Sequence, residues 1–307
     1  LMLRCCGAPA EWAGQREMFG EAVREITHQW QELGQPSFIV ACSSCYQVLK
    51  NSFPASKITS LWEIYDRIGL PEGCVEANPG TVTVHDACST RQEKHIHESV
   101  RRILKKLNYN VEELKNSREK TECCGYGGLM CFANPELAVQ VVDRRIHESK
   151  SDYLTYCTMC RDRFAAGSKR AFHMLDLIYG SNKKALAGRK GPGYSQRHEN
   201  RARLKNRMLR EVWREEVVEL KSFEKIELEL SDEVKEIMEN RLILVEDIQK
   251  VIEHAEGSGN KLYNEDNGHY LASFRPVSVT YWVVYSRRGK QYIIHNAYSH
   301  RMQVSGM

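Results

Sequence analysis

The most constraining feature of this sequence is a cysteine pattern that occurs twice. Two adjacent cysteines followed by glycine stand at Cys5–Gly7 and again at Cys123–Gly125. A Cys-x-x-Cys motif follows each pair, after 35 residues at Cys42/Cys45 and after 32 residues at Cys157/Cys160. A pattern that recurs at nearly constant spacing predicts one supersecondary unit used twice. Cys88 stands before the second pair, with 34 residues between them. With Cys88 included, the pattern accounts for nine of the eleven cysteines.

Length and composition predict a protein with substantial hydrophobic cores. The 307 residues, 42% of them hydrophobic, are enough for two or three domains. The longest nearly uncharged apolar segment, Val277–Tyr285, is far shorter than the roughly 20 residues of a membrane helix. The first residues also lack the charged head and long apolar core of a signal peptide. We therefore expect a cytoplasmic protein without a membrane span, in which clustered thiols bind metal rather than form disulfides.

The alternation of strand and helix patterns predicts α/β repeats. Gly80–Asp86 has the β-branched alternation of a strand that ends just before Cys88, and Asn134-Pro135 is a typical helix start. Further helices are expected at 18–33, 61–68 and 92–107, further strands at 37–41 and 152–156, and a last helix from Cys157 to about Tyr179. The cysteines thus fall at strand ends and helix starts, where α/β folds place their sites.

Changes in charge divide the chain into four expected parts. These are a first cysteine-rich repeat at 1–76, a second repeat at 77–180, a basic linker and helix at 181–216, and a small α+β domain at 217–307. The linker carries 11 Lys and Arg against four acids, whereas 217–257 carries 12 acids against five bases. Without interleaved aromatic residues, and beside an acidic segment, the basic run does not predict nucleic-acid binding.

The last part contains no cysteine, and its pattern is that of a meander. Strands are expected at 225–230, 270–274, 277–285 and 291–296, with a helix at 245–254 and a hairpin turn at Arg287-Arg288-Gly289. The chain begins with Leu1, inside the first repeat. We therefore expect that this repeat is truncated and that a longer protein carries a cysteine 35 positions before Cys5.

Two vicinal thiolates suit a multi-iron cluster better than a single tetrahedral ion, because adjacent side chains in extended backbone point apart. The second repeat also offers five cysteines, whereas a structural zinc ion takes four. The glycines after Cys124 leave bare amide donors that can approach cluster sulfides closely. A zinc site or ordinary buried thiols remain the alternative.

Cysteines spaced as Cys88, Cys123-Cys124-Gly125 and Cys157-Thr-Met-Cys160 resemble the cysteine-rich CCG domain. That domain occurs in tandem in a subunit of heterodisulfide reductase, in the iron–sulfur subunit of glycolate oxidase and in lactate-utilisation iron–sulfur proteins. The resemblance covers residues 1 to about 180. It implies a noncubane [4Fe-4S] cluster on the second repeat, with the following ligands: Cys88, Cys123, Cys124, Cys157 and Cys160. In the first repeat it implies Cys5, Cys6, Cys42 and Cys45, which lack a fifth ligand and could hold either a cluster or zinc.

The resemblance implies an iron–sulfur oxidoreductase subunit similar to heterodisulfide reductase. Its partners would be ferredoxin-type and flavoprotein subunits of a multi-subunit complex, and its substrate a small-molecule disulfide or thiol. One alternative is the electron-relay subunit of a flavin-dependent glycolate or lactate dehydrogenase. Another is a zinc-stabilised scaffold, against which the fifth cysteine argues. Gly125-Tyr-Gly-Gly128 lacks the G-x-G-x-x-G spacing of a dinucleotide site.

Other reactive residues lie outside the pattern. Cys74 and Cys131 are interpreted as buried hydrophobic side chains. His85, His95 and His97 lie near Cys88 in sequence and could relay protons, but we interpret them as surface or strand-end residues. The C-terminal histidines His269, His295 and His300 have no fixed metal-ligand spacing, so no metal site is predicted there.

Overall fold

The structure is a computed structural model that describes residues 4–77, 79–214 and 221–301. The chain forms two compact units, Met2–Gly191 and Pro192–Met307, and each is described by itself. Their boundary falls inside the segment 181–216 that the sequence predicts to be a linker. The predicted boundary between residues 216 and 217 lies outside the described residues. None of the described helices has the length and apolar character needed to cross a membrane.

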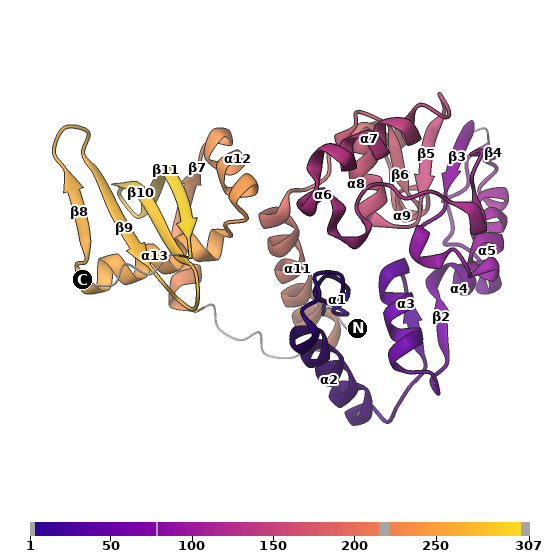
Figure 1. Ribbon diagram of the computed structural model, residues 1–307, viewed down its shortest axis with the longest axis horizontal. Coiled ribbons are helices and arrows are strands. Elements are labelled where there is room, and N and C mark those ends of the chain that lie inside the picture. The colour runs from indigo at the N-terminus through magenta and orange to yellow at the C-terminus, as the bar shows by residue number, and fades with distance from the viewer. Residues whose placement is uncertain (1–3, 78, 215–220, 302–307) are drawn as a thin grey trace. The chain divides into compact units, whose positions relative to one another are not determined.

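The second repeat is built on a four-stranded parallel sheet in the order β4-β3-β5-β6 (Figure 1). Its strands are β3 (Thr81–His85), β4 (Asn110–Glu113), β5 (Asp152–Thr155) and β6 (Ala171–His173). Its helices are α5 (Lys94–Lys106), α6 (Met130–Ala133), α7 (Pro135–Ile146), α8 (Thr158–Ala166), α9 (Met174–Tyr179) and α10 (Lys183–Gly188). Four of the five residues of β3 are buried, as expected for a central strand of a parallel sheet covered on both faces.

Local signals in the sequence explain most of these elements. The apolar spacing of residues 96–107 predicts the buried face of α5, which the structure confirms. Asn134 caps α7, because its side-chain oxygen accepts the Leu137 N–H at 3.0 Å, and Pro135 is the first helical residue.

The prediction of one continuous helix from Cys157 to about Tyr179 is wrong. Helix α8 ends at Ala166, and the chain reverses where Ser168 takes a positive φ of 61°. Residues Ala171–His173 then pair with β5 as the edge strand β6, and α9 follows. The turn places a three-residue strand where the apolar pattern alone favours a helix.

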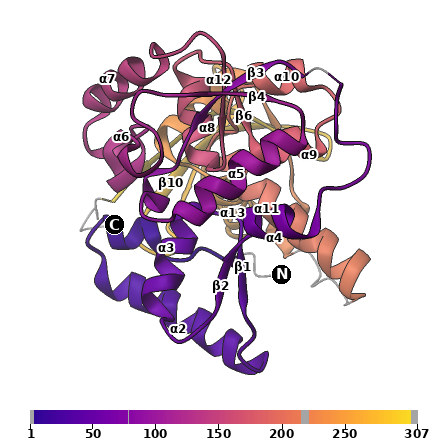
Figure 2. The ribbon, with the colours of Figure 1, turned by 90° about the vertical axis from the view of Figure 1, so that its right-hand side faces the viewer.

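The first repeat reproduces the later half of the second. Its elements are α1 (Ala8–Trp12), α2 (Arg16–Glu32), β1 (Phe38–Val40), α3 (Ser43–Ser52), β2 (Ile58–Ser60) and α4 (Leu61–Ile68). Strands β1 and β2 run parallel and side by side, as β5 and β6 do (Figure 2). Ser60 forms a capping box at the start of α4, and His173 does the same for α9. The equivalent helices and strands confirm the predicted tandem α/β repeats.

The two repeats share one hydrophobic core. Trp62 of α4 is only 1% exposed, and its ring meets Tyr156 at 6.3 Å and His173 at 5.9 Å between centroids. Both partners belong to the second repeat, so the two parallel sheets are packed within a single unit. A common core of this kind fixes the strand ends of one repeat relative to those of the other.

The C-terminal unit is a small α+β domain, which confirms the predicted class. Its helices are α11 (Tyr194–Met208), α12 (Asp232–Arg241) and α13 (Val245–Ser258), and a π-helical turn occupies Leu209–Trp213. Its strands are β7 (Glu227–Leu230), β8 (Lys261–Asn264), β9 (His269–Phe274), β10 (Thr280–Arg288) and β11 (Gln291–His300). They form one sheet in the order β7-β11-β10-β9-β8, and buried residues of α12 and α13 pack against it. Only the β7–β11 pair is parallel.

The limits of the long hairpin differ from the expectation. Strand β10 begins at Thr280, because Val277 is 86% exposed and follows Pro276, which has no N–H for a sheet hydrogen bond. Arg288 pairs with Gln291, so the turn consists of the two residues between them rather than residues 287–289.

Candidate metal centre

The structure brings all five cysteines of the second repeat together. Cys88 lies just beyond β3, Cys123 and Cys124 precede α6, Cys157 follows β5, and Cys160 lies in the first turn of α8. Parallel strands end at the same edge of the sheet, which is why residues so distant in sequence meet there. A continuous series of side-chain hydrogen bonds runs from Cys88 through Cys123, Cys124 and Cys160 to Cys157.

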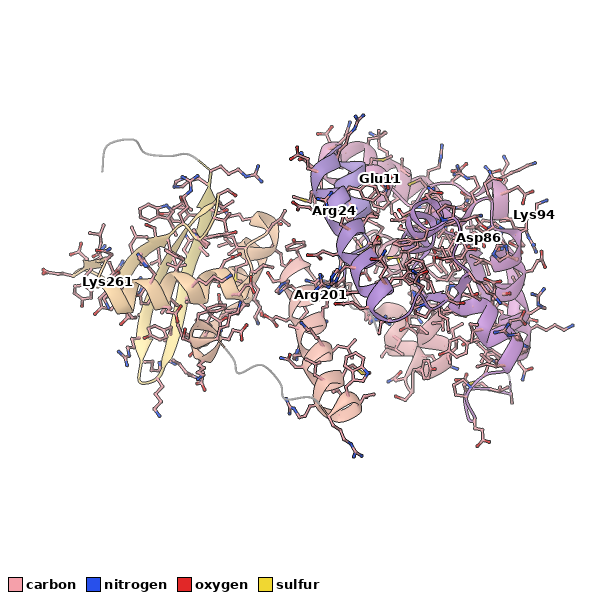
Figure 3. The ribbon with its side chains drawn as sticks, turned by 90° about the horizontal axis from the view of Figure 1, so that it is seen from below. Glu11, Arg24, Asp86, Lys94, Arg201 and Lys261 are labelled. Carbon is pink, nitrogen blue, oxygen red and sulfur yellow. The ribbon has the colours of Figure 1, made fainter. Side chains whose placement is uncertain are left out.

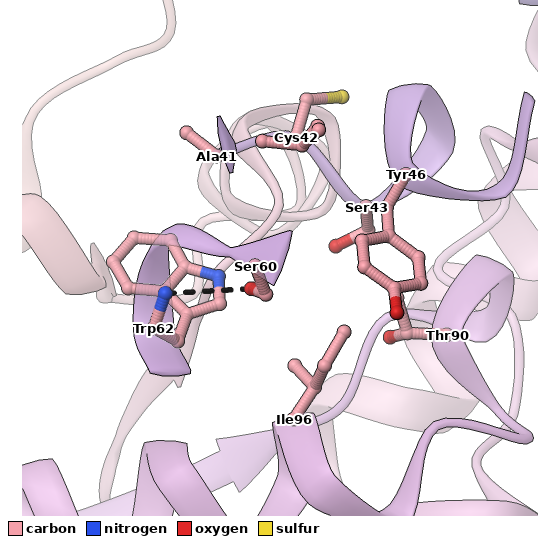
Figure 4. Close-up of a pocket in the computed structure, with 9 residues that line it drawn as sticks. Ala41, Cys42, Ser43, Tyr46, Ser60, Trp62, Thr90 and Ile96 are labelled. Carbon is pink, nitrogen blue, oxygen red and sulfur yellow. Dashed lines mark hydrogen bonds between the residues drawn. The ribbon is translucent and has the colours of Figure 1, made fainter. Parts of the chain in front are cut away.

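The four cysteines of the first repeat form a second cluster. Cys5 hydrogen-bonds Cys6, Cys6 hydrogen-bonds Cys45, and Cys45 hydrogen-bonds Cys42. Cys6 is buried and Cys45 half-buried, whereas Cys5 and Cys42 are exposed. Figure 4 shows Cys42 at the edge of a small pocket, with its sulfur directed away from Ile96. The eleven cysteines all lie among the described residues, and none of them forms a disulfide bond.

Backbone geometry explains why a glycine follows each cysteine pair. Gly7 and Gly125 have φ angles of 89° and 81°, in the left-handed region that favours glycine. Each donates its backbone N–H to the first sulfur of its pair, Gly7 to Cys5 at 3.5 Å and Gly125 to Cys123 at 3.3 Å. A Cβ atom at Gly125 would lie 2.8 Å from the carbonyl oxygen of Ala138 in α7. The motif therefore needs glycine both for its turn and for close helix packing.

Each Cys-x-x-Cys motif forms the beginning of a helix. Cys42 and Cys157 are the N-cap residues of α3 and α8, and Cys45 and Cys160 lie in the first turns. Hydrogen bonding to Cys45 and to nearby backbone N–H groups lowers the pKa of Cys42 to about 7. Cys157 likewise has a lowered pKa, first through Cys160 and then through backbone N–H groups of α8. Helix N-termini stabilise thiolates, the form of cysteine that binds metal.

The charge of the second cluster is shared unequally among its sulfurs. Hydrogen bonds from Cys124 and Cys88 hold the pKa of Cys123 far below its ordinary value, and the N–H groups of Gly125 and Gly127 add to this effect. The pKa values of Cys88 and Cys124 are raised, first because each hydrogen-bonds Cys123 and then because of burial. Metal binding requires the thiolate form, so a bound metal would displace the protons of these thiols.

A buried carboxylate ties together two of the loops that carry the cysteines. Asp86 lies in the interior of the N-terminal unit (Figure 3), where Arg101 donates two hydrogen bonds to it at 2.5 and 2.8 Å. Burial raises the pKa of Asp86, but these hydrogen bonds outweigh it and lower the pKa. The backbone N–H of Arg118 also donates to its carboxylate, and Thr121 Oγ1 donates to its carbonyl oxygen, both at 2.8 Å. Asp86 thus holds the segment before Cys123 against the end of β3.

His85 lies at the end of a strand, as the sequence predicts, but the sequence did not predict its burial beside the cysteines. The structure buries it completely at the end of β3, and burial lowers its pKa to about 3. Its nearest ring nitrogen lies within 4.8 Å of the Cys124 and Cys160 sulfurs. Arg145 of α7 donates from Nε to His85 Nδ1 at 3.3 Å. The sequence signal for this pair is an arginine on the same helix face as the buried residues Ala138 and Val142, because a buried guanidinium requires partners.

A small, open cavity borders the second cluster. Trp12 of the first repeat and Tyr126 of the second meet edge to face at its wall, with centroids 6.3 Å apart, and Met159 adds an apolar surface. The described residues that line it include no Asp, Glu, Lys or Arg. The Cys42 thiolate is close enough to raise the pKa of Cys157, so the two clusters are neighbours.

The remaining candidates have ordinary environments. Cys74 is buried in the shared core, as predicted, whereas Cys131 is half-buried in α6. His97 is buried in α5, which contradicts its interpretation as a surface residue. His95 is partly exposed, and its Nε2 lies 3.2 Å from the Tyr46 hydroxyl.

The C-terminal histidines are engaged with neighbouring rings. His269 and His295 stack with centroids 3.7 Å apart. His300 Nε2 accepts a hydrogen bond from Trp282 Nε1 at 2.9 Å.

The fold and the two thiol clusters define a cysteine-rich α/β protein. Residues 2–50 and 82–162 match the cysteine-rich domain family CCG. The match confirms the tandem domain on which the sequence resemblance was based. No solved structure matches the chain.

Similar curated proteins are related to oxidoreductases. The chain is 25% identical over 186 residues to an EtfAB:quinone oxidoreductase of Syntrophomonas wolfei, covering 54% of this chain and 26% of that protein. It is 26% identical over 172 residues to an uncharacterized iron–sulfur protein of Methanocaldococcus jannaschii, covering 54% and 34%. It is 24% identical over 180 residues to one subunit of the dihydromethanophenazine:CoB–CoM heterodisulfide reductase of Methanosarcina barkeri, covering 53% and 44%. The chain thus matches less than half the length of each of these relatives.

The thiols of the second repeat fit an iron–sulfur cluster. Five sulfurs exceed the four that a tetrahedral zinc ion takes, and soft thiolates are the ligands such clusters use. Gly127 keeps space open beside them, since a Cβ there would lie 3.5 Å from Cys123 Sγ and 3.7 Å from Cys88 Sγ. The four sulfurs of the first repeat fit either zinc or a cluster.

Proposed function

We propose that this chain is a subunit of an iron–sulfur oxidoreductase that delivers electrons to a disulfide substrate. In this proposal a [4Fe-4S] cluster of the noncubane type is held by Cys88, Cys123, Cys124, Cys157 and Cys160. A second metal centre, a cluster or zinc, is held by Cys5, Cys6, Cys42 and Cys45. Electrons come from ferredoxin-type or flavoprotein subunits of the same complex.

The observation that carries the proposal is the meeting of five cysteine side chains beside an open cavity whose other lining residues are apolar or neutral. When bound, an iron–sulfur cluster would supply one-electron transfer and iron sites with affinity for sulfur. The similarity to part of a heterodisulfide reductase supports a disulfide as the substrate. A cavity that opens toward the cysteines gives a substrate sulfur access that a fully enclosed relay centre would not need.

The residues of the cavity suit an apolar part of a disulfide substrate. Trp12, Tyr126 and Met159 offer apolar contact area and exclude water around the reacting sulfurs. Reduction of one disulfide takes two electrons from the partner subunit and two protons from solvent, and it yields two thiols. Asp86 and Arg101 keep the loops that carry Cys88 and Cys123 in register during this cycle.

A second candidate function is electron relay within a flavin-dependent hydroxyacid dehydrogenase. The electron-relay role, though not the hydroxyacid substrate, is supported by the similarity to a protein whose name gives EtfAB and quinone as reactants. In this case the cavity would be covered by a partner subunit, and the five cysteines would serve only to hold the relay centre.

Metal content tests the site itself. Anaerobically purified protein is expected to contain about four irons and four acid-labile sulfides per complete cysteine motif. Cys124→Ser should lose this iron, because Cys124 lies in the middle of the hydrogen-bonded series, whereas the control Cys74→Ser should keep it. Stoichiometric zinc with negligible sulfide would contradict the proposal.

Access of a thiol to the site separates the two functions. Oxidised protein mixed with a small apolar thiol should give a new paramagnetic signal that is broadened by iron-57. Trp12→Ala should weaken the response to the thiol without reducing the iron content, because Trp12 lines the cavity without supplying a thiol. If thiols and disulfides leave the spectrum unchanged while a reduced flavoprotein partner reduces the protein rapidly, relay is the function.

A further inference from the structure

The environment of His85 fixes where its ring carries a proton. Arg145 is completely buried, and each end of its guanidinium is held: Nη1 donates to Glu148 at 2.9 and 3.0 Å, and Nη2 donates to the Asn116 carbonyl at 2.7 Å. The remaining Nε–H points to His85 Nδ1 at 3.3 Å. A guanidinium has donors only, so Nδ1 must accept. The ring proton of His85 is therefore on Nε2.

The orientation of the ring is also fixed. The Phe164 ring packs edge to face against it, with centroids 4.8 Å apart and planes at 85°. His85 Nε2 is buried and has no hydrogen-bond partner among the residues that the structure describes. A buried N–H without an acceptor is unfavourable, so such a group normally has a partner. A ring nitrogen of His85 lies within 4.8 Å of the Cys124 and Cys160 sulfurs, which makes this cluster the nearest source of an acceptor.

We propose that His85 Nε2–H donates a hydrogen bond to sulfur of the metal centre, either to the Cys124 or Cys160 thiolate or to an inorganic sulfide, and is not itself a ligand. The proposal deepens the proposed function and rests on the cluster assigned to the second repeat. A nitrogen that carries the ring proton has no lone pair for iron, which is why the Arg145 contact excludes ligation through Nε2.

The role of this donor is to set the reduction potential. A hydrogen bond to a thiolate or sulfide offsets negative charge, and the reduced centre carries one more negative charge than the oxidised centre. The donor thus stabilises the reduced form and raises the potential. His85 acts by placing its N–H beside the sulfur, and Arg145 acts only by holding the proton of His85 on Nε2.

The first experiment reads the tautomer without any cluster. In the full chain with iron removed by chelation and histidines labelled with nitrogen-15, the nitrogen shifts of His85 should show the proton on Nε2. Arg145→Met, which removes the fixed donor, should allow the other tautomer to appear. A proton on Nδ1 in the unsubstituted protein would overturn the proposal, whatever metal the protein binds.

The second experiment uses the reduced iron-loaded protein, with iron and sulfide measured in the same sample. Pulsed EPR in H₂O and D₂O should detect a weak histidine nitrogen coupling and the coupling of an exchangeable proton in addition to that of the Gly125 N–H. His85→Phe keeps a ring for packing but removes the donor. It should abolish both couplings and shift the one-electron reduction equilibrium about tenfold toward the oxidised form, about 59 mV.

His85→Gln is the matched variant, because its amide can donate from nearly the position of Nε2. It should keep the exchangeable proton and have a reduction potential close to that of the unsubstituted protein. A strong nitrogen coupling in the unsubstituted protein would identify His85 as a ligand and overturn the proposal, as would an unchanged potential in His85→Phe. Absence of iron and sulfide from the sample would instead refute the proposed function, and the tautomer measurement would still decide the protonation of His85.

Discussion

Replacing Gly125 by alanine should destabilise the N-terminal unit far more than replacing Gly128, three residues later. Both glycines have positive φ angles, 81° and 65°, so each substitution incurs the cost of left-handed backbone, about 1–2 kcal/mol. A Cβ at Gly128 would have no heavy atom within 4 Å. At Gly125 it would lie 2.8 Å from the Ala138 carbonyl oxygen and 3.2 Å from Val142 Cγ2.

The contact at Gly125 adds a second cost. The atom in the way is a backbone oxygen of α7, which cannot move without displacing the helix, and overpacking of this kind costs about 1–3 kcal/mol. We therefore expect Gly125→Ala to lower the free energy of unfolding by roughly 2–5 kcal/mol and Gly128→Ala by about 1–2 kcal/mol. The displaced loop should also weaken the binding of iron by Cys123 and Cys124.

Hydrogen exchange measured by mass spectrometry resolves the effect by segment. Amides of α7 should exchange roughly 5- to 150-fold faster in Gly125→Ala than in Gly128→Ala, which corresponds to about 1–3 kcal/mol. Amides of α13, in the other compact unit, provide an internal reference that should not change. Equal exchange rates for α7 amides in the two variants would show that the close approach of α7 to Gly125 does not add to the loss of stability.

Three further predictions concern ion pairs and domain boundaries. Arg101→Met leaves the Asp86 carboxylate buried without its main partner and should lower the free energy of unfolding, measured by urea titration, by about 3–5 kcal/mol. Adding Asp86→Asn should recover part of this loss, and strictly additive effects of the two substitutions would contradict the pairing. Burial raises the pKa of Glu256, but hydrogen bonds, first of all from Lys261, lower it overall. Its stabilisation is therefore present above the pKa of the unfolded chain and is lost as pH falls through the lower folded pKa, so Glu256→Gln should flatten the acid side of the melting-temperature profile. A fragment 192–307 should unfold cooperatively on its own and contain no iron, and failure to fold would argue against the boundary after residue 191.

Much of the fold follows from local signals. The strand before Cys88, the apolar face of α5 and the Asn134 cap each depend on residues close together in sequence, so their patterns predict them well. The short strand β6 could not be predicted in this way. Three residues are too few for a periodic pattern, and their pairing with β5 depends on the reversal at Ser168.

The sequence predicted which cysteines form the clusters much better than it predicted the residues that surround them. His85 reads as a strand-end residue, and Arg145 reads as one of several charges on a helix. Their meeting depends on the packing of α7 against the end of β3, which brings together residues 60 positions apart. The cavity wall is similar, because Trp12 and Tyr126 come from different repeats and meet only through the shared core.

The sequence by itself determined that nine cysteines form a repeated pattern, because residue type and spacing are properties of the chain. It also determined the glycine of each pair, since only glycine readily adopts the turn that follows two adjacent cysteines. The tertiary structure alone decided which thiols share protons, which histidine faces them and which aromatic rings border the cavity. Those properties arise from burial and from contacts between segments distant in sequence, and no local pattern encodes such contacts.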